Sequence, residues 1–186
     1  MDKLRGTIIS VLNLLDRPVY RTEIVKFVYM IDEMHFRHFG KTVTGLNYMW
    51  DNFGPNSIGD AIVNEASELG NLGIINIWME PNSHGSHSYK YKLNKQDETL
   101  TGTLSDVEKY VIRDITCHYK NYTLDELIDA SKQTESFKGV NQYEVIKLKK
   151  SNKYAELIKS LSIDQEFKEG MQAVTKDIGE LDACKN

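Results

Sequence analysis

The order in which hydrophobic patterns follow one another over the first 93 residues sets the tightest limit on the fold. Apolar side chains recur every three to four residues in three stretches, which predicts helices, and strand-like alternation follows them. The predicted elements are helices over 4–15, 20–38 and 58–70, an extended segment over 43–51, and strands over 74–80 and 88–93. The polar segment 81–87 joins the two strands as a hairpin loop. This order predicts a mainly helical α+β fold carrying a small antiparallel β-hairpin, as in a winged helix.

Turn and cap residues mark the boundaries of these elements. Gly40 is a suitable C-cap for the second helix because glycine adopts a positive φ without strain. Residues 53–56 (Phe-Gly-Pro-Asn) read as a turn, and Ser57 as the N-cap of the helix that follows. Ile58 and Leu69 of that helix are expected to point inward.

The second half of the chain reads as helical. Ser105 to Glu108 and Thr123 to Glu126 each have the spacing of a capping box, in which each side chain satisfies a free backbone N–H of the other. Two further helices are expected, over about 142–161 and about 163–183. We therefore assign residues 1–140 to one domain and 141–186 to a C-terminal helical extension that packs on the domain or on a partner.

A winged helix raises the possibility of DNA binding, with 58–70 as the recognition helix and 81–88 as the wing. The predicted recognition helix carries Asp60, Glu65 and Glu68 and has no lysine or arginine. A helix in the major groove lies between phosphates and usually brings cations to them. Lysines at 90, 92 and 95 give the wing mild support, but a protein contact through this element fits the charge better.

Length, charge and cysteine content bound the protein class. The chain has 186 residues and a formal net charge of -4, which is about one domain with no excess of positive charge for nucleic acid. Cys117 and Cys184 are its only cysteines, as expected in a reducing compartment. No apolar run reaches the roughly 18 residues of a membrane span, and the N-terminus lacks the form of a signal peptide. We expect a cytoplasmic protein with no membrane association.

Few residues suggest chemistry. The candidates are the pairs His35 and His38, His84 and His87, and Asp32 and Glu33. A zinc site could draw two ligands from each histidine pair, but nothing in the sequence brings the pairs together. Asp32 can orient His35 or accept a tyrosine hydroxyl, and the chain contains none of the common catalytic motifs. We expect no catalytic residues, no metal, no cofactor and no enzymatic activity.

Lysines at 147, 149, 150, 153 and 159 form a basic run, opposed between 142 and 160 only by Glu144 and Glu156. A solvated helix face accounts for this run. The alternative is a docking face for an acidic partner.

The stretch from Val25 to Ser57 carries a family signature. The residues that match it in order are Lys26, Tyr29, Asp32, His35, Gly40, Lys41, Trp50, Gly54 and Pro55. This stretch resembles the SocA-like antitoxin family, also called the Panacea domain, in which a helix of the form K-L-L-Y-x-A-x-x-x-H precedes a Gly-Lys, an extended segment, an aromatic residue and a Gly-Pro turn. A second block, from Leu104 to Leu127, is similar to the family's second block, so the resemblance covers roughly residues 5 to 140.

The chain departs from the family at two places in that second block. Family members usually continue with Thr-His and then Pro-Trp, where this chain has Ser131-Lys132 and Ser136-Phe137. The matched residues have an architectural reading: Gly54 and Pro55 fix the backbone between an extended segment and a helix, and Trp50 supplies apolar area. None of this requires a substrate.

The resemblance implies an antitoxin-like protein that binds and neutralises a cognate toxin, or delivers it to a protease, by recognition without chemistry. It also implies a gene next to that of the toxin, in some cases on a phage or mobile element. The alternative is a winged-helix DNA-binding transcriptional regulator, and the two roles can coexist.

Aromatic and apolar side chains are the first candidates for the partner interface, because interface centres favour Tyr, Trp, Phe and Met. The candidates are Trp78, Tyr89, Tyr91, Phe167, Met171 and Val174. The last three lie on a heptad-like seam that needs a surface to pack on, whether the domain, a partner protein or a second copy of the chain.

Overall fold

The computed structural model describes residues 2–81, 87–94 and 102–151 of the chain. Its helices are α1 (Asp2–Leu15), α2 (Arg21–Phe39), the short 3-10 helix η1 (Ile58–Asp60), α3 (Ala61–Asn71), α4 (Asp106–Tyr119) and α5 (Leu124–Lys132). Its strands are β1 (Val19–Tyr20), β2 (Tyr48–Asp51), β3 (Gly54–Ser57), β4 (Ile75–Pro81), β5 (His87–Leu93) and β6 (Val145–Ile146). The prediction of a mainly helical α+β fold is confirmed.

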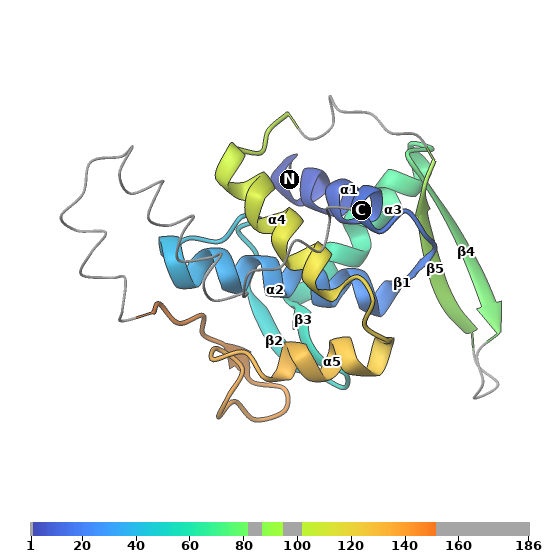
Figure 1. Ribbon diagram of the computed structural model, residues 1–186. Helices are drawn as coiled ribbons and strands as arrows, with labels where there is room; N and C mark the ends of the chain where they lie inside the picture. Colours follow the sequence, from blue (N-terminus) through green and yellow to red (C-terminus); the bar gives the residue numbers. More distant parts are fainter. Residues whose placement is uncertain (1, 82–86, 95–101, 152–186) are drawn as a thin grey trace.

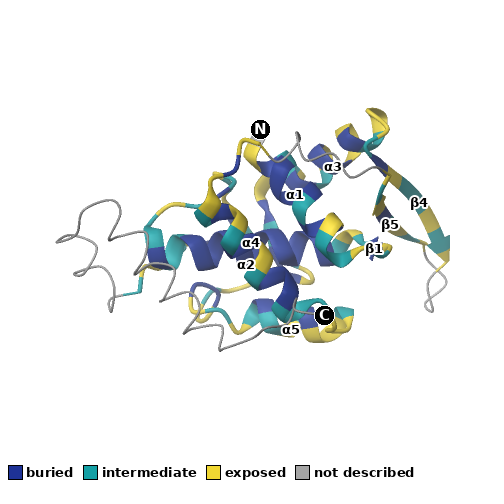
Figure 2. Ribbon diagram, turned by 45° about the horizontal axis from the view of Figure 1, so that its top comes forward, coloured by how far each residue is buried: buried dark blue, intermediate teal, exposed yellow. Residues whose placement is uncertain are grey.

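Helix α2 runs through the centre of the molecule (Figure 1). Helices α1 and α4 lie along one side of it, and β2, β3 and α5 lie along the other. Most of its side chains are buried (Figure 2), as expected of a helix enclosed on several sides. The surrounding elements are therefore held together largely by their contacts with α2.

The ends of α2 are fixed by local hydrogen bonds. At its start, the Glu23 carboxylate accepts from the Tyr20 backbone N–H at 2.7 Å and pairs with Arg17 at 2.7 Å. At its end, Gly40 has a φ of 70° and donates its N–H to the Phe36 carbonyl. The C-cap predicted for Gly40 is confirmed.

The first sheet has the strand order β1-β5-β4 and is antiparallel throughout. The β4–β5 hairpin extends from the helical body at the end where α2 begins (Figure 1). Strand β1 lies between α1 and α2 in the chain. Apart from β2, β3 and η1, which stand between α2 and α3, the order α1, β1, α2, α3, β4, β5 is that expected of a winged helix. The hairpin prediction is confirmed, and its loop residues 82–86 lie outside the described part of the chain.

The second sheet, β3-β2-β6, was not predicted. Residues Gly54 and Pro55 belong to β3 rather than to a turn, and the turn lies at Asn52 and Phe53. Pro55 is tolerated because β3 is an edge strand, where a missing backbone N–H breaks no ladder bond. Only 48–51 of the predicted extended segment 43–51 forms a strand.

The helix predicted over 142–161 is wrong for residues 142–151, and its remainder lies outside the described residues. Tyr143 has a φ of 67°, which a helix does not allow. The Tyr143 N–H donates to the Trp50 carbonyl at 2.7 Å, and the Trp50 N–H donates to the Glu144 carbonyl at 2.9 Å. Backbone pairing with β2 thus overrides the helical spacing of the apolar side chains in this segment.

The helix predicted over 58–70 is broken near its start. Gly59 and Asp60 have φ values of 70° and 53°, so α3 begins only at Ala61. Ile58 is 44% exposed, which contradicts its predicted inward position, whereas Leu69 is buried as predicted. The predicted capping role of Ser57 is partly kept, because its hydroxyl accepts from the Ile62 N–H at 3.2 Å.

Both predicted capping boxes are present, at Ser105 with Glu108 and at Thr123 with Glu126. Glu108 also forms an ion pair with Lys3, in which Glu108 Oε1 and Lys3 Nζ are 2.6 Å apart, and this pair ties α1 to the start of α4. The helix predicted over 163–183 lies outside the described residues.

Candidate functional site

The family-signature residues of α2 follow one another at intervals of three: Lys26, Tyr29, Asp32 and His35. Three residues rotate a helix by about 300°, so successive side chains move round α2 by about 60°. Lys26 and His35 therefore point in roughly opposite directions. Each residue contacts one or more segments that follow α2 in the chain, and together they fasten those segments to the helix.

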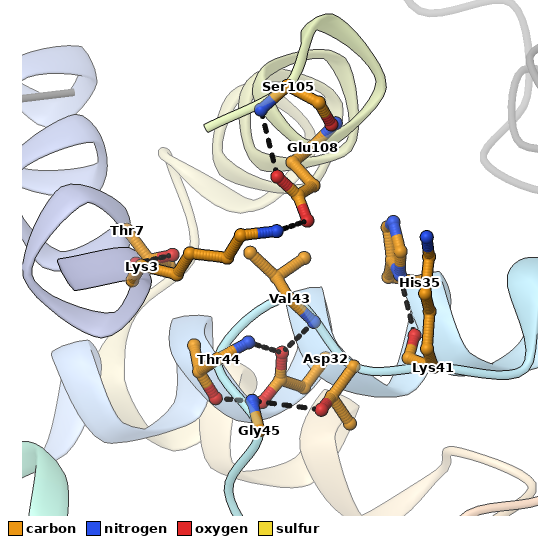
Figure 3. Close-up of polar contacts among 11 residues, drawn as sticks. Lys3, Thr7, Asp32, His35, Lys41, Val43, Thr44, Gly45, Ser105 and Glu108 are labelled. Carbon is orange, nitrogen blue, oxygen red and sulfur yellow. Dashed lines mark hydrogen bonds and ion pairs between the residues drawn. The ribbon is translucent and has the colours of Figure 1, made fainter. Parts of the chain in front are cut away.

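Asp32 holds the loop between α2 and β2 (Figure 3). Its carboxylate accepts the Val43 and Thr44 backbone N–H groups at 2.8 and 2.9 Å and also the Thr44 hydroxyl. A fourth donor is the Tyr48 hydroxyl, at 2.7 Å. Asp32 is fully buried, and this burial raises its pKa to about 6 although the hydrogen bonds act in the other direction. Of the two roles foreseen for Asp32, accepting a tyrosine hydroxyl is the one observed.

Tyr29 links α2 to the second sheet and to the segment after α5. Its ring meets the Tyr48 ring edge-on, with centroids 5.1 Å apart. Its hydroxyl hydrogen-bonds the Thr134 hydroxyl at 2.8 Å, and Thr134 in turn donates to the Ser131 carbonyl. Burial raises the pKa of Tyr29, so the hydroxyl stays protonated and donates. This chain of contacts joins the two blocks of the family signature.

Lys26 joins α2 to β3. Its amine is buried and donates to the Pro55 carbonyl at 2.6 Å. Burial lowers the pKa of Lys26 to about 7, and this effect outweighs the opposing attraction of Asp51. Gly54 beside it has a φ of 91°, and a Cβ there would lie 3.3 Å from the Lys132 side chain. The Gly-Pro pair therefore brings the β3 backbone close to both α2 and α5.

His35 is buried at the other end of the helix, where its Nδ1 is 2.6 Å from the Lys41 carbonyl (Figure 3). Burial lowers its pKa, so the neutral ring donates from Nδ1 to the carbonyl. Asp32 and His35 bond to different parts of the loop and form no acid–base pair with each other.

The residues that depart from the family pattern are also used inside the fold. The Ser136 hydroxyl donates to the buried Glu33 carboxylate at 3.1 Å and accepts the Lys149 N–H at 3.0 Å. The Phe137 ring packs on the Trp50 ring with centroids 4.7 Å apart. The Ser131 hydroxyl donates to the Ile128 carbonyl, and Lys132 contacts Gly54. The sequence offered no signal for the role of Glu33, because its partner lies 103 residues away.

A surface cavity of about 210 Å³ opens between the start of α2, the β2–β3 turn and the start of α3. Its polar lining includes Arg21, Lys26, Asp51, Asn56 and Asp60. Phe53, which is 65% exposed, borders the same cavity. Two carboxylates beside an exposed ring are suited to contact with the side chains of another protein.

The histidine pairs are not brought together in the part of the chain that the structure describes. His35 and His38 are buried in α2, His87 is exposed at the start of β5, and His84 lies outside the described residues. Among the described residues, no group of three or more His, Cys, Asp or Glu side chains could hold a metal ion. Within the same residues no helix is long and apolar enough to cross a bilayer.

The predicted partner-binding residues have different surroundings. Tyr89 is 41% exposed, and Trp78 is half-buried with its Nε1 donating to Glu80 at 2.8 Å. Tyr91 is buried at 3% exposure. The exposed position expected of Tyr91 is therefore wrong, because β5 points this ring into the core, and its role in partner binding stays a prediction. Phe167, Met171 and Val174 lie outside the described residues. The exposed side chains of Phe53, Tyr143 and Val145 were not among the predicted candidates, because they belong to the second sheet and its turns, which were not predicted.

A family model described as Antitoxin SocA-like, Panacea domain, matches residues 24–138, which is more than half of the 186 residues. The matched range runs from the start of α2 to just beyond α5 and so contains the contacts that fasten β2, β3 and α5 to α2. Comparison with curated proteins and with solved structures gives no match. The resemblance seen in the sequence is confirmed, and the chain belongs to the antitoxin-like SocA family of Panacea domains.

Proposed function

We propose that this protein is an antitoxin that neutralises a cognate toxin protein by binding it in the cytoplasm. The observation that carries the proposal is the family match over residues 24–138. The proposal gives the protein a binding role without catalysis. In support, the side chains most suggestive of chemistry, Asp32 and His35, are both engaged in holding the loop after α2.

The test is growth rescue by the intact chain. Each protein encoded beside this gene, including neighbours on a phage or mobile element, is expressed from an inducible promoter with and without the chain. We expect one neighbour to arrest growth, the chain to restore it, and the two proteins to purify together in a fixed ratio. An Asp32→Leu variant, which leaves four buried donors without an acceptor, serves as an unfolded control. Toxicity that the intact chain does not relieve would overturn the proposal.

The same strains separate sequestration from delivery to a protease. A pulse-chase experiment measures the half-life of the toxin with and without the chain. An unchanged or longer half-life indicates neutralisation by a stable complex. A shorter half-life that depends on one cellular protease indicates an adaptor.

A second candidate function is DNA binding as a winged-helix regulator, and the β1-β5-β4 sheet beside α1, α2 and α3 favours it. The charge opposes it, because α3 contains no lysine or arginine and exposes Glu68. A mobility-shift assay with the DNA upstream of the gene tests this role. Binding that falls steeply with salt would support it, and absence of binding at low salt would exclude it for that DNA.

A further inference from the structure

The second sheet has one covered face and one open face. Directly paired residues of an antiparallel sheet point to the same side. Tyr48 pairs with Ser57 and Ile146, and all three are buried. Met49 pairs with Asn56 and Val145, and these point away from the core. We call the side that carries Met49, Asn56 and Val145 the outer face.

Exposed apolar side chains concentrate on this outer face and at its edges. Eight large hydrophobic side chains among the described residues are exposed, and four of them lie in the second sheet, in its turns or at the start of η1 directly after β3. These four are Phe53 (65%), Tyr143 (61%), Val145 (55%) and Ile58 (44%). Ile58 extends the ladder by donating its N–H to the Asn47 carbonyl, which places it on the same side as Asn56. Exposed apolar side chains gathered on one small sheet commonly mark an interaction site.

Two carboxylates lie within this apolar surface. The Asn56 side-chain amide donates to Asp51 at 3.3 Å and to Asp60 at 3.1 Å. Neither carboxylate forms an ion pair with a cation among the described residues. Of the two cations that line the adjoining cavity, Arg21 lies 5.6 Å from the centroid of the Tyr89 ring. The Lys26 amine donates to the Pro55 carbonyl and is attracted by Asp51 without an ion pair to it. The outer face therefore presents two carboxylates, the exposed Asp60 and the half-buried Asp51, with no ion pair to a described cation.

We propose that the outer face of the second sheet is where the partner protein binds, and that the partner places an arginine or lysine side chain against Asp51 and Asp60. This inference rests on the proposed protein-binding function. Phe53, Ile58 and Val145 supply the apolar contacts around that cation, which is the composition of a protein interface centre. The same carboxylates repel phosphates, so a nucleic acid does not fit this face.

The experiment uses the intact, isotope-labelled chain and two synthetic peptides. One is an amphipathic peptide of alternating leucine and arginine, and the other has glutamate in place of each arginine. Backbone amide shifts are followed during titration at low salt. We expect the basic peptide to shift Met49, Phe53, Asn56 and Asp60, and the acidic peptide to leave them unchanged. Equal binding of both peptides, or shifts confined to another surface, would overturn the proposal.

Matched variants separate charge from general surface effects. The double variant Asp51→Asn, Asp60→Asn removes the two carboxylates of the outer face, and we expect about fivefold weaker binding of the basic peptide. Asp16→Asn with Glu68→Gln removes two exposed carboxylates outside the second sheet and should leave the affinity unchanged. The double variant Phe53→Ser, Val145→Ser should also weaken binding. Equal effects of the two charge-removing variants would contradict the assignment.

Two further outcomes name a different occupant and also overturn the proposal. Sedimentation of the free chain as a dimer that Val145→Ser converts to a monomer would assign the face to a second copy. Cross-linking of a Val145→Cys variant to residues 152–186 of its own chain would assign it to the C-terminal segment. Because the peptide titration uses no toxin, rescue of growth without peptide binding refutes only this surface, and peptide binding without rescue refutes only the antitoxin role.

Discussion

Replacing Asp32 with asparagine removes one titrating carboxyl from the centre of the fold and keeps its shape. The asparagine oxygen can still accept the Val43 and Thr44 N–H groups, and its amide can donate to the Thr44 and Tyr48 hydroxyls once these rotate. We therefore expect Asp32→Asn to fold. The informative quantity is how the stability difference between the two proteins changes with pH.

The direction follows from the pKa of Asp32, which burial raises from 3.8 to about 6 in the folded protein. The folded state then binds more protons than the unfolded state between these two values, so stability falls as the pH rises through this window. The contribution of Asp32 is fully present below pH 3.8 and is lost above about pH 6. Integrated from pH 4 to pH 7, the loss is about 2 kcal/mol.

The assay is urea unfolding of both proteins at pH 4, 5, 6 and 7. Subtracting the two free energies of unfolding at each pH cancels every other titrating group. The Asp32→Asn substitution should cost about 2 kcal/mol more at pH 4 than at pH 7. Thr44→Val, which removes a donor that favours the carboxylate, should make the fall in stability between pH 4 and pH 7 larger than in the unsubstituted protein.

A flat difference, or one that grows as the pH rises, would refute this reasoning. It would mean that the four donors outweigh the burial of the charge and hold the pKa of Asp32 at or below its ordinary value. The experiment therefore decides whether the folded protein favours the protonated form of Asp32 or its carboxylate.

Three further predictions test the other contacts of α2. Burial lowers the pKa of Lys26 to about 7, so the unfolded state binds more protons than the folded state between pH 7 and pH 9, and stability should rise by about 2 kcal/mol over this range. Lys26→Met should remove this rise, which denaturant unfolding at several pH values measures; the same change of stability with pH in both proteins would contradict the prediction. Gly54→Ala should cost about 1–2 kcal/mol, because φ is 91° and Lys132 lies against the added Cβ; thermal unfolding measures it, and a melting temperature equal to that of the parent would count against the backbone argument. Ser136→Ala should cost about 1–3 kcal/mol, because it removes one donor to the buried Glu33 carboxylate and the acceptor of the Lys149 N–H, whereas Ser67→Ala, on an exposed serine, should change stability by less than about 0.5 kcal/mol; similar losses in the two variants would refute the Ser136 network.

Local signals in the sequence were sufficient for α1, α2, α4, α5 and the β4–β5 hairpin, whereas β1 was not predicted. Capping residues such as Ser105 and Thr123, and the alternation along β5, act within one or two turns of chain and can be read without knowledge of the fold. Gly40 could be assigned as a C-cap for the same reason. These features depend on neighbouring residues, so they could be predicted without knowledge of the tertiary contacts.

The second sheet could not be read in this way, because its pairing depends on distant residues. Strand β6 pairs with β2, almost one hundred residues earlier in the chain. Its residues have helical spacing, and only the backbone bonds between Trp50 and Tyr143 and Glu144 make it extended. Gly54 and Pro55 were predicted to form a turn because nothing in the sequence indicates that they belong to an edge strand. The outer face was missed with the sheet that forms it.

The contacts of Ser136 and Phe137, which differ from the family pattern, bear on whether this chain keeps the proposed function. Ser136 and Phe137 contact Glu33 and Trp50, so they act on the junction between α5, α2 and β2. The carboxylates and exposed apolar side chains of the outer face are different residues, and the contacts of Ser136 and Phe137 do not involve them. A change in that junction alters how the elements are fastened together, while partner binding depends on what the outer face presents. If the outer face binds the partner as proposed, departure from the family pattern at Ser136 and Phe137 gives no measure of the proposed antitoxin role, which has to be tested at Asp51, Asp60 and Phe53.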